Sequence, residues 1–441
     1  MRQRPKKPRA PVACRPRPNS PLRTEKIVAK LQPVRGTHDL IGDDARAHLA
    51  IVAAAREIAD RYGYGPMSTP IFEFTDVFQR TLGDTSDIVT KEMYTFEDKG
   101  GDSLTLRPEG TAGIARAVIS GGLRDKLPLK CFYTGPMFRH ERPQKGRLRQ
   151  FHQIGVELIG VAEPSGDVEA IALGADILDA LGILSETTLE LNTLGDGESR
   201  AAYRDALVAY FTGHTDKLSD DSRERLQRNP LRILDSKNAD DRAVITDAPV
   251  FDDYLSDDAR VFFDAVRSGL DTIGIAYTLN PRLVRGLDYY SHTAFEFTTE
   301  ALGAQGTVLA GGRYDGLIET MGGPATPGVG WAAGVERLAM MLGEPAAATR
   351  PIALVGMGED GERETVRLAR ELRRAGLTIE LLYKGGVKRG LKRADRTHAA
   401  AAVLIGDDEL AKGSVTVRNL DSGEQADVAI ADLTDHLAAY R

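Results

Sequence analysis

Two β-like runs at 130–138 and 151–159 flank one long polar loop, and this arrangement most constrains the fold of the chain. Strands joined by a single loop pair antiparallel, whereas parallel strands need a crossover of a dozen or more residues. Further short β-like runs lie at 103–106, 293–299 and 306–310. We therefore predict an α+β fold, in which an antiparallel sheet is flanked by helices, and not a doubly wound parallel sheet.

Apolar residues at helical spacing predict a helix over 43–61 and another near 112–120. A glycine-rich segment at 328–342 is typical of a strand that runs into a helix. Residues from about 195 to 275 are mostly helical in pattern and rich in Asp and Arg, without obvious site chemistry. We expect them to form an inserted helical subdomain of a large domain that spans 27–343.

Beyond a linker at 344–350, strand and helix patterns alternate. The strands are expected at 352–355, 378–382 and 401–405, and the helices at 362–375 and 387–396. Such alternation predicts a separate α/β domain over 350–441 with a mainly parallel core.

The N-terminal segment is basic and rich in proline: its first 24 residues hold eight Lys or Arg, six Pro and no acid. It cannot bury enough apolar surface to offset its ordering entropy, so we predict a disordered tail over 1–26. The alternative is that the tail adds phosphate contacts to an RNA partner.

Charge, cysteine content and hydropathy exclude several classes of protein. The net charge is -7, so any nucleic-acid surface must be a local basic patch. The two cysteines, Cys14 and Cys131, cannot build a disulfide framework or a four-ligand zinc site, and we assign no metal-binding residues. No apolar run is long enough to cross a membrane, so we expect a cytoplasmic protein without a membrane partner.

The loop at 138–153 carries four arginines and a lysine between two strands. Planar guanidinium groups suit phosphate oxygens, Glu141 could accept from an exocyclic amine, and Phe151 offers a stacking face. A solvated basic hairpin would explain the loop equally well if it stood alone.

Four further blocks carry candidate chemistry. In RPEGT at 107–111, Glu109 and Thr111 lie at a strand-to-helix junction, where a helix N-cap is the simpler explanation for Thr111. RGLDYY at 285–290 and AGGRYDGL at 310–317 combine arginines with glycines that allow close backbone approach, although paired tyrosines are usually core residues. GVGWAAGVER at 328–337 brings an arginine to a helix start, where it could reach a phosphate tail.

Taken together and in order, these blocks resemble a known family. Pro70 after the first long helix, FRHE with RQFHQ, and GVER are similar to the three motifs of class II aminoacyl-tRNA synthetases. RPEGT, RGLDYY and AGGRYDGL resemble the blocks of histidyl-tRNA synthetases, and the resemblance covers about residues 33–441. It implies an antiparallel catalytic sheet, a helical insertion, a C-terminal anticodon-binding domain and a homodimer.

The resemblance also implies a reaction: L-histidine reacts with ATP to give histidyl-adenylate, and the histidyl group then passes to the 3′ end of tRNA(His). ATP is a substrate, and Mg²⁺ is expected to bridge its phosphates, since this hard cation needs few protein ligands. Attack of a carboxylate on the α-phosphate brings two anions together, so fixed cations are the main catalytic need.

Site residues follow position by position from the resemblance. The histidine pocket would be formed by Glu109, Gly110, Thr111, Arg139, Gln153, Glu157, Arg285, Tyr289 and Tyr290. ATP would be held by Arg139, Glu141, Arg147, Phe151 and Arg337. The catalytic cations would be Arg139 and Arg285 at the α-phosphate and Arg337 at the polyphosphate tail. The tRNA would contact Gln144, Lys145, Lys388, Lys392 and Arg396.

The last three of these residues recur at i, i+4 and i+8 in the helix expected at 387–396, where a solvated basic face would give the same pattern. Leu148 stands where the family commonly has an aromatic residue, and Ser291-His292 where Asn or Thr with Gly is commoner. These departures, with Lys145 in the loop, leave recognition of the first tRNA base pair open.

Two other readings compete with this one. The first is a non-aminoacylating regulatory paralogue of ATP phosphoribosyltransferase, which generally lacks the anticodon domain. The second is a class II synthetase for proline, threonine or glycine, against which the RGLDYY and AGGRYDGL blocks argue.

Overall fold

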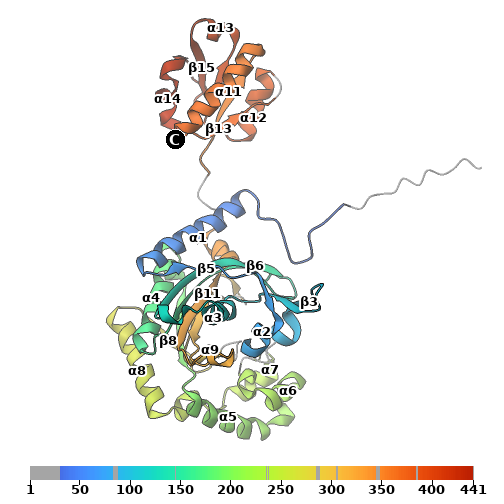
Figure 1. Ribbon diagram of the computed structural model, residues 1–441, viewed down its shortest axis with the longest axis vertical. Helices are drawn as coiled ribbons and strands as arrows, with labels where there is room; N and C mark the ends of the chain where they lie inside the picture. Colours follow the sequence, from blue (N-terminus) through green and yellow to red (C-terminus); the bar gives the residue numbers. More distant parts are fainter. Residues whose placement is uncertain are drawn as a thin grey trace, which may run out of the picture.

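The computed structural model describes residues 30–82, 88–144, 146–234, 236, 238–284, 289–303, 306–343, 348–383 and 386–440. Its centre is an eight-stranded sheet in the order β1-β5-β6-β11-β10-β9-β7-β8, and the six inner strands pair antiparallel (Figure 1). In this order the strands are Gly65–Pro66, Leu129–Phe138, Gln150–Ile159, Gly328–Gly334, Thr307–Arg313, Ser291–Thr298, Thr188–Thr193 and Thr278–Leu279. The expected antiparallel sheet is confirmed.

One face of this sheet packs against four helices. They are α1 (Asp43–Arg61), α4 (Pro164–Ala180), α8 (Asp257–Thr272) and α10 (Val335–Leu342). Strand residues alternate between the two faces because successive side chains of a strand point to opposite sides. On β5, Phe132 therefore joins the core under the four helices, while its neighbours Cys131 and Tyr133 join the core of the opposite face.

The opposite face carries α3 (Thr111–Ser120) and the short α9 (Leu317–Thr320). The β-like run at 103–106 was expected in the large sheet because it lies beside the other runs in the sequence. The structure places it elsewhere. It forms β4 (Ser103–Leu106) in a separate three-stranded antiparallel sheet with β2 (Phe72–Phe74) and β3 (Tyr94–Glu97). The helix α2 (Thr75–Leu82) follows β2 directly.

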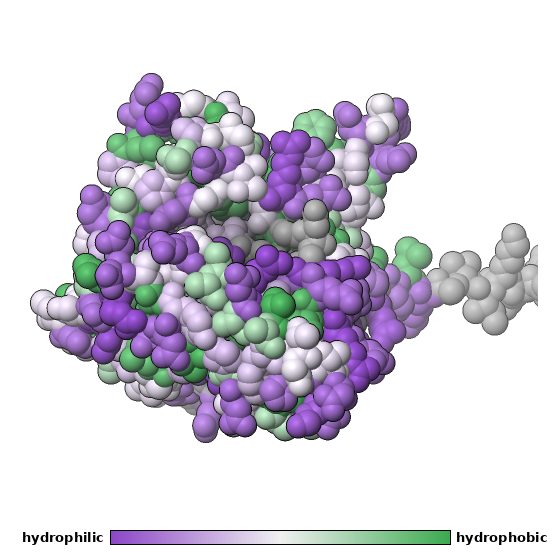
Figure 2. All heavy atoms as spheres, turned by 90° about the horizontal axis from the view of Figure 1, so that it is seen from below, coloured by the Kyte–Doolittle hydropathy of each residue, from purple (hydrophilic) through white to green (hydrophobic). Residues whose placement is uncertain are grey.

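The segment between β7 and β8 is helical, with α5 (Gly197–Thr212), α6 (Asp220–Arg228) and α7 (Ala239–Ile245) sharing a core of their own. The sequence pattern had grouped α8 with these helices, but α8 packs against α4 under the large sheet. The end of the molecule where α5 lies is mainly hydrophilic, with scattered apolar residues (Figure 2).

The two ends of this helical segment meet. The carboxylate of Asp196 accepts a hydrogen bond at 2.7 Å from the Ser199 hydroxyl and one at 2.6 Å from the Ser256 hydroxyl, 60 residues away along the chain. The backbone N–H of Ser256 in turn donates to the Ser199 hydroxyl at 2.9 Å. Asp196 caps α5 and Ser256 caps α8, so one small polar cluster fixes the points where the chain enters and leaves the helical segment.

Residues 352–440 form a second body around a five-stranded sheet in the order β13-β12-β14-β15-β16 (Figure 1). Its strands, in this order, are Ile379–Leu381, Ile352–Gly356, Ala401–Ile405, Ser414–Asn419 and Gln425–Ala429. Its helices are Gly358–Arg374 (α11), Val387–Arg396 (α12), Asp407–Ala411 (α13) and Leu433–His436 (α14). The three expected strands pair parallel, whereas β15 and β16 add an antiparallel edge that was not predicted.

The predicted tail over 1–26 lies outside the described residues, as do positions 344–347 of the predicted linker. No helix in the described part of the chain is long and apolar enough to cross a membrane.

Candidate active site

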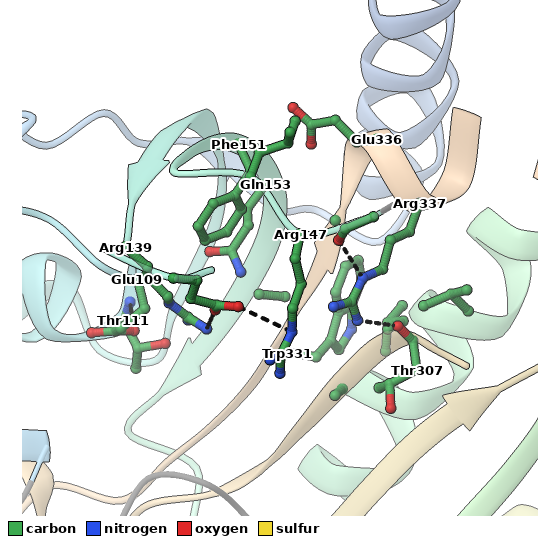
Figure 3. A pocket seen from close by; sticks show the side chains of 18 of the residues that line it. Glu109, Thr111, Arg139, Arg147, Phe151, Gln153, Thr307, Trp331, Glu336 and Arg337 are labelled. Carbon is green, nitrogen blue, oxygen red and sulfur yellow. Dashed lines mark hydrogen bonds and ion pairs between the residues drawn. The ribbon is translucent and has the colours of Figure 1, made fainter. Parts of the chain in front are cut away.

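A large cavity opens over the strands β6, β10 and β11, beside the loop that joins β5 to β6 (Figure 3). It holds about 1010 Å³ of empty space, its open mouth included. Eleven of its lining residues are Glu109, Thr111, Arg139, Glu141, Arg147, Phe151, Gln153, Tyr289, Tyr290, Glu336 and Arg337. Nearly all the described residues expected to bind histidine or ATP therefore come together in one place.

One part of the cavity wall is rich in guanidinium groups. Arg337, at the start of α10, donates to the carbonyl oxygen of Thr307 at 2.6 Å, which holds its side chain across the strands (Figure 3). Burial, and next the positive charge of Arg147, lower the pKa of the Arg337 guanidinium. Arg139 acts in the same direction, while Glu141 opposes it. A polyanion entering here would relieve the repulsion among three fixed cations.

Glu141 is the carboxylate among these arginines. Its Oε2 lies 3.0 Å from Nε of Arg147, and its Oε1 lies 4.0 Å from a terminal nitrogen of Arg139. Arg139 also donates through Nε to the Pro108 carbonyl at 2.9 Å and lies 5.3 Å from the ring centroid of Phe151. Contacts with fixed backbone and ring atoms orient the Arg139 fork before any ligand binds.

The cavity wall also contains carboxylates and tyrosines. Glu109 accepts hydrogen bonds from the backbone N–H groups of Thr111 at 2.6 Å and Ala112 at 2.8 Å, at the start of α3. Glu109 therefore does the capping that the sequence suggested for Thr111, whose hydroxyl is directed elsewhere. Burial raises the pKa of Glu109, and these backbone hydrogen bonds oppose the rise.

Glu157 lies behind this lining, fully buried on β6. It accepts hydrogen bonds from the hydroxyl groups of Thr111 at 2.7 Å and Tyr314 at 2.5 Å. Burial raises its pKa to about 8, against the effect of these donors. Gly330 on β11 is the strand partner of Glu157 on β6. A Cβ on Gly330 would lie 1.9 Å from the Glu157 carboxylate, so this position has room only for glycine.

The ring of Tyr133 lies between two glycines, Gly110 and Gly155. A Cβ on Gly110 would lie 2.3 Å from one ring carbon of Tyr133, and a Cβ on Gly155 would lie 2.3 Å from another. Gly110 thus belongs to the wall behind the cavity, not to its lining, because its missing side chain makes room for the ring.

Gln153 offers a buried polar atom to a ligand. Within the described residues its Oε1 has no hydrogen-bond partner, although Gln153 lines the cavity. Buried polar groups are nearly always hydrogen-bonded, so an unpaired acceptor in a cavity wall is a reason to expect a donor on the ligand.

The remaining site residues divide into three groups. Arg285 and Lys145 lie outside the described residues. Gln144 is exposed in the loop, bridged to Arg147 through backbone hydrogen bonds. Lys388, Lys392 and Arg396 are exposed together on α12, in the second body.

Two functional candidates were not assigned from the sequence. Tyr314 stood inside the AGGRYDGL block, and Tyr133 lies in β5 one strand away from Glu157; both surround that carboxylate. The block itself marked Tyr314, whereas only the pairing of Gly155 with Tyr133 across β5 and β6 reveals the second residue.

An antiparallel sheet that carries such a cavity defines the class, because this is the fold of the class II aminoacyl-tRNA synthetases. Residues 36–338 match the family model of histidyl-tRNA synthetase, and residues 352–440 match that of an anticodon binding domain. The chain belongs to the histidyl-tRNA synthetase family.

Relatives agree with this assignment along almost the whole chain. A histidine–tRNA ligase of Rhodospirillum rubrum is 60% identical over 94% of this chain and 100% of its own length. One of Gluconacetobacter diazotrophicus is 60% identical over 93% of this chain and 99% of its own. The solved apo structure of Staphylococcus aureus histidyl-tRNA synthetase is similar with a TM-score of 0.77 and 35% identity, covering 92% of this chain and 99% of that one.

The resemblance read from the motifs is therefore confirmed: the chain is a histidine–tRNA ligase of the aminoacyl-tRNA synthetase class. The alternative, a regulatory paralogue of ATP phosphoribosyltransferase, is not supported, because residues 352–440 match the anticodon binding domain that such paralogues generally lack.

Proposed function

We propose that the chain activates L-histidine with ATP in the cavity over β6, β10 and β11 and then charges tRNA(His). The observation that carries this proposal is one continuous cavity that is lined by three arginines, Arg139, Arg147 and Arg337, and also by Glu109, Tyr289 and Tyr290. The arginines suit a polyphosphate, and the carboxylate and the tyrosines suit a small polar amino acid.

The arginines have distinct parts in adenylate formation. Arg139 would hold both the α-phosphate and the histidine carboxylate, while Arg147 and Arg337 would hold the polyphosphate tail. The carboxylate of histidine attacks the α-phosphorus, a bond to the bridging oxygen breaks, and diphosphate leaves. No general base is needed, and cations that are already oriented stabilise the charge that gathers on the α-phosphate. Arg285, outside the described residues, keeps its proposed place beside that phosphate.

Adenine would lie against Phe151, with Glu141 accepting from its exocyclic amine. Glu141 is 10% exposed, so part of its carboxylate reaches the cavity. The aromatic face of Phe151 is already covered on one side by the Arg139 guanidinium, which favours a planar base on the other.

Histidine would be selected by polar groups that a wrong side chain leaves unpaired. Gln153 offers its free Oε1 to a donor, and Glu109, Tyr289 and Tyr290 line the same cavity. Glu157 would act on the imidazole from behind the lining, through the position it gives Thr111. Each buried polar group left unpaired costs about 1–3 kcal/mol, which is a factor of roughly 5 to 150 in specificity.

Mg²⁺ would enter with ATP. The described carboxylates that line the cavity are already engaged: Glu109 by backbone N–H groups, Glu141 by Arg147 and Glu336 by His152. This donor set fits a hard cation that is held mainly by phosphate oxygens and water. When bound, Mg²⁺ neutralises part of the charge on the leaving diphosphate.

The tRNA would be held at two places. Gln144 and Lys145, in the loop beside the cavity mouth, would face its acceptor end. The exposed cations of α12 would contact the anticodon side, although Arg393 on the same helix is engaged by Glu380 at 2.6 Å. A cytoplasmic location follows from this role in translation.

A homodimer would cover apolar side chains of the small sheet. Phe72, Phe74 and Phe96 are about half exposed there, and Ile71 precedes them. Clusters of exposed large apolar residues are typical of interaction sites. Phe74→Asp should give a monomer in sedimentation velocity, whereas Val261→Asp, on an exposed position of α8, should leave the dimer intact.

The decisive experiment is amino-acid-dependent exchange of pyrophosphate into ATP by the purified chain. Exchange is expected with histidine and not with proline, threonine or glycine. Exchange with another amino acid, or none with well-folded protein, would overturn the proposal.

A further inference from the structure

Three side chains that could bind a metal meet where α1, β6 and α10 come together. They are His48 on α1, His152 on β6 and Glu336 on α10, and each offers a ligand atom within 4.8 Å of the other two. Glu336 also lines the cavity, and in Figure 3 its carboxylate lies above the Arg337 side chain. None of these residues has a part in the proposed chemistry of histidine activation.

Hydrogen bonds and a ring contact hold the three side chains in place. Both carboxylate oxygens of Glu336 accept from the backbone N–H of His152, at 2.9 and 3.0 Å, and Oε1 also lies 2.8 Å from Nδ1 of the same histidine. The His48 ring stands edge-on to the His152 ring, with centroids 5.4 Å apart and an interplanar angle of 83°.

His48 is nearly buried, with 9% of its surface exposed. His48 offers one ring nitrogen as a possible ligand atom, within 4.8 Å of those of His152 and Glu336. Two imidazoles with one carboxylate are a ligand set that suits borderline transition metals, Zn²⁺ above all, and not Mg²⁺ or Ca²⁺.

We propose that His48, His152 and Glu336 form a binding site for Zn²⁺ or a similar divalent transition metal. Three protein ligands leave one tetrahedral position for water. Tetrahedral ligands at about 2.0–2.1 Å from Zn²⁺ stand about 3.3 Å apart. His152 Nδ1 and Glu336 Oε1 therefore move apart by about half an ångström, and His48 swings in by a rotation of its ring.

A metal binds an imidazole nitrogen that carries no hydrogen, so the bound metal would replace the contact between His152 Nδ1 and Glu336 Oε1. The bound metal would join α1 to β6 and to the first turn of α10, of which β6 and α10 are already connected by the hydrogen bonds between His152 and Glu336. Its occupancy should therefore raise the thermal stability of the large domain.

The test is titration of chelator-treated, full-length chain with ZnCl₂ by calorimetry, with CoCl₂ as a spectroscopic substitute. We expect one site per chain, a rise in Tm with Zn²⁺, and the visible absorption of four-coordinate Co²⁺. His48→Ala and His48→Asn should each weaken Zn²⁺ binding at least about tenfold and abolish the Tm rise. The exposed surface histidine of α14 provides the matched control, and His436→Ala should bind Zn²⁺ like the parent chain.

Melting curves of the metal-free variants show whether each one folds. The proposal is refuted if the parent chain binds no Zn²⁺. It is equally refuted if folded His48 variants retain parental affinity, or if His436→Ala loses as much affinity as they do, since binding would then be adventitious.

Discussion

Glu157 should make the stability of the large domain fall as the pH rises. In the unfolded chain this carboxyl ionises near its ordinary pKa of 4.5, whereas burial raises the pKa to about 8 in the folded chain. Between these two values the folded chain binds one more proton than the unfolded chain. The contribution of Glu157 to the unfolding free energy is therefore fully present below about pH 4.5 and is lost as the pH rises through about 8.

The size of the effect follows from the shift. One pKa unit corresponds to about 1.4 kcal/mol, so a shift of this size corresponds to about 5 kcal/mol of unfolding free energy. Glu157→Gln keeps a neutral acceptor beside Thr111 and Tyr314 but cannot ionise. The difference in unfolding free energy between the parent chain and this variant should therefore fall by several kcal/mol between pH 5 and pH 9.

Urea denaturation at a series of pH values can measure this difference. The chain has one tryptophan, Trp331, which is buried and lies on β11 next to Gly330, the partner of Glu157. Its fluorescence reports the large domain alone, which matters because a chain of several domains does not unfold in one step. A difference that stays constant with pH would mean that Glu157 is already ionised at pH 5, and the argument from burial would be wrong.

Three further outcomes are expected. Gly155→Ala should destabilise the large domain by about 1–3 kcal/mol in urea denaturation, because its Cβ meets Tyr133, whereas Gly197→Ala on α5, where nothing lies within 4 Å, should be neutral or slightly stabilising. Arg313→Met should cost about 3–5 kcal/mol by the same measurement, since it leaves the buried Asp167 unpaired, and a second change of that aspartate to Leu should recover most of the loss. Arg337→Gln should lower the single-turnover rate of adenylate formation about 10²–10³-fold at saturating ATP, with a much smaller loss of ATP affinity; an equal loss of both would make Arg337 a binding group only.

The sequence predicted the elements with strong periodicity and missed those whose signal is tertiary. The helix over 43–61 and the strand at 401–405 have the expected bounds, because each is a continuous apolar pattern. The strand β7 was missed although Leu189 and Leu191 alternate, since it is short and is stabilised mainly by pairing with β9. The strands β15 and β16, of which β16 is the edge of the sheet, were missed because each carries polar residues on one side.

The site was predictable as far as its motifs are local. Arg139, Gln153 and Arg337 come from separate blocks, and the fold brings them to one cavity as the resemblance implied. The arrangement behind the lining was not predictable, because it depends on contacts across strands: Glu157 opposite Gly330, and Tyr133 between two glycines. The metal ligands are a similar case, since His48 and Glu336 are almost 300 residues apart and carry no shared motif.

The hydrogen bonds between Asp196, Ser199 and Ser256 make the helical segment between them a closed loop on a narrow stem. Both ends of the stem are fixed to the large domain, one by β7 and the other by α8, so the segment can change in length or sequence without opening the sheet. A homologue could exchange this segment as a cassette while keeping the catalytic cavity.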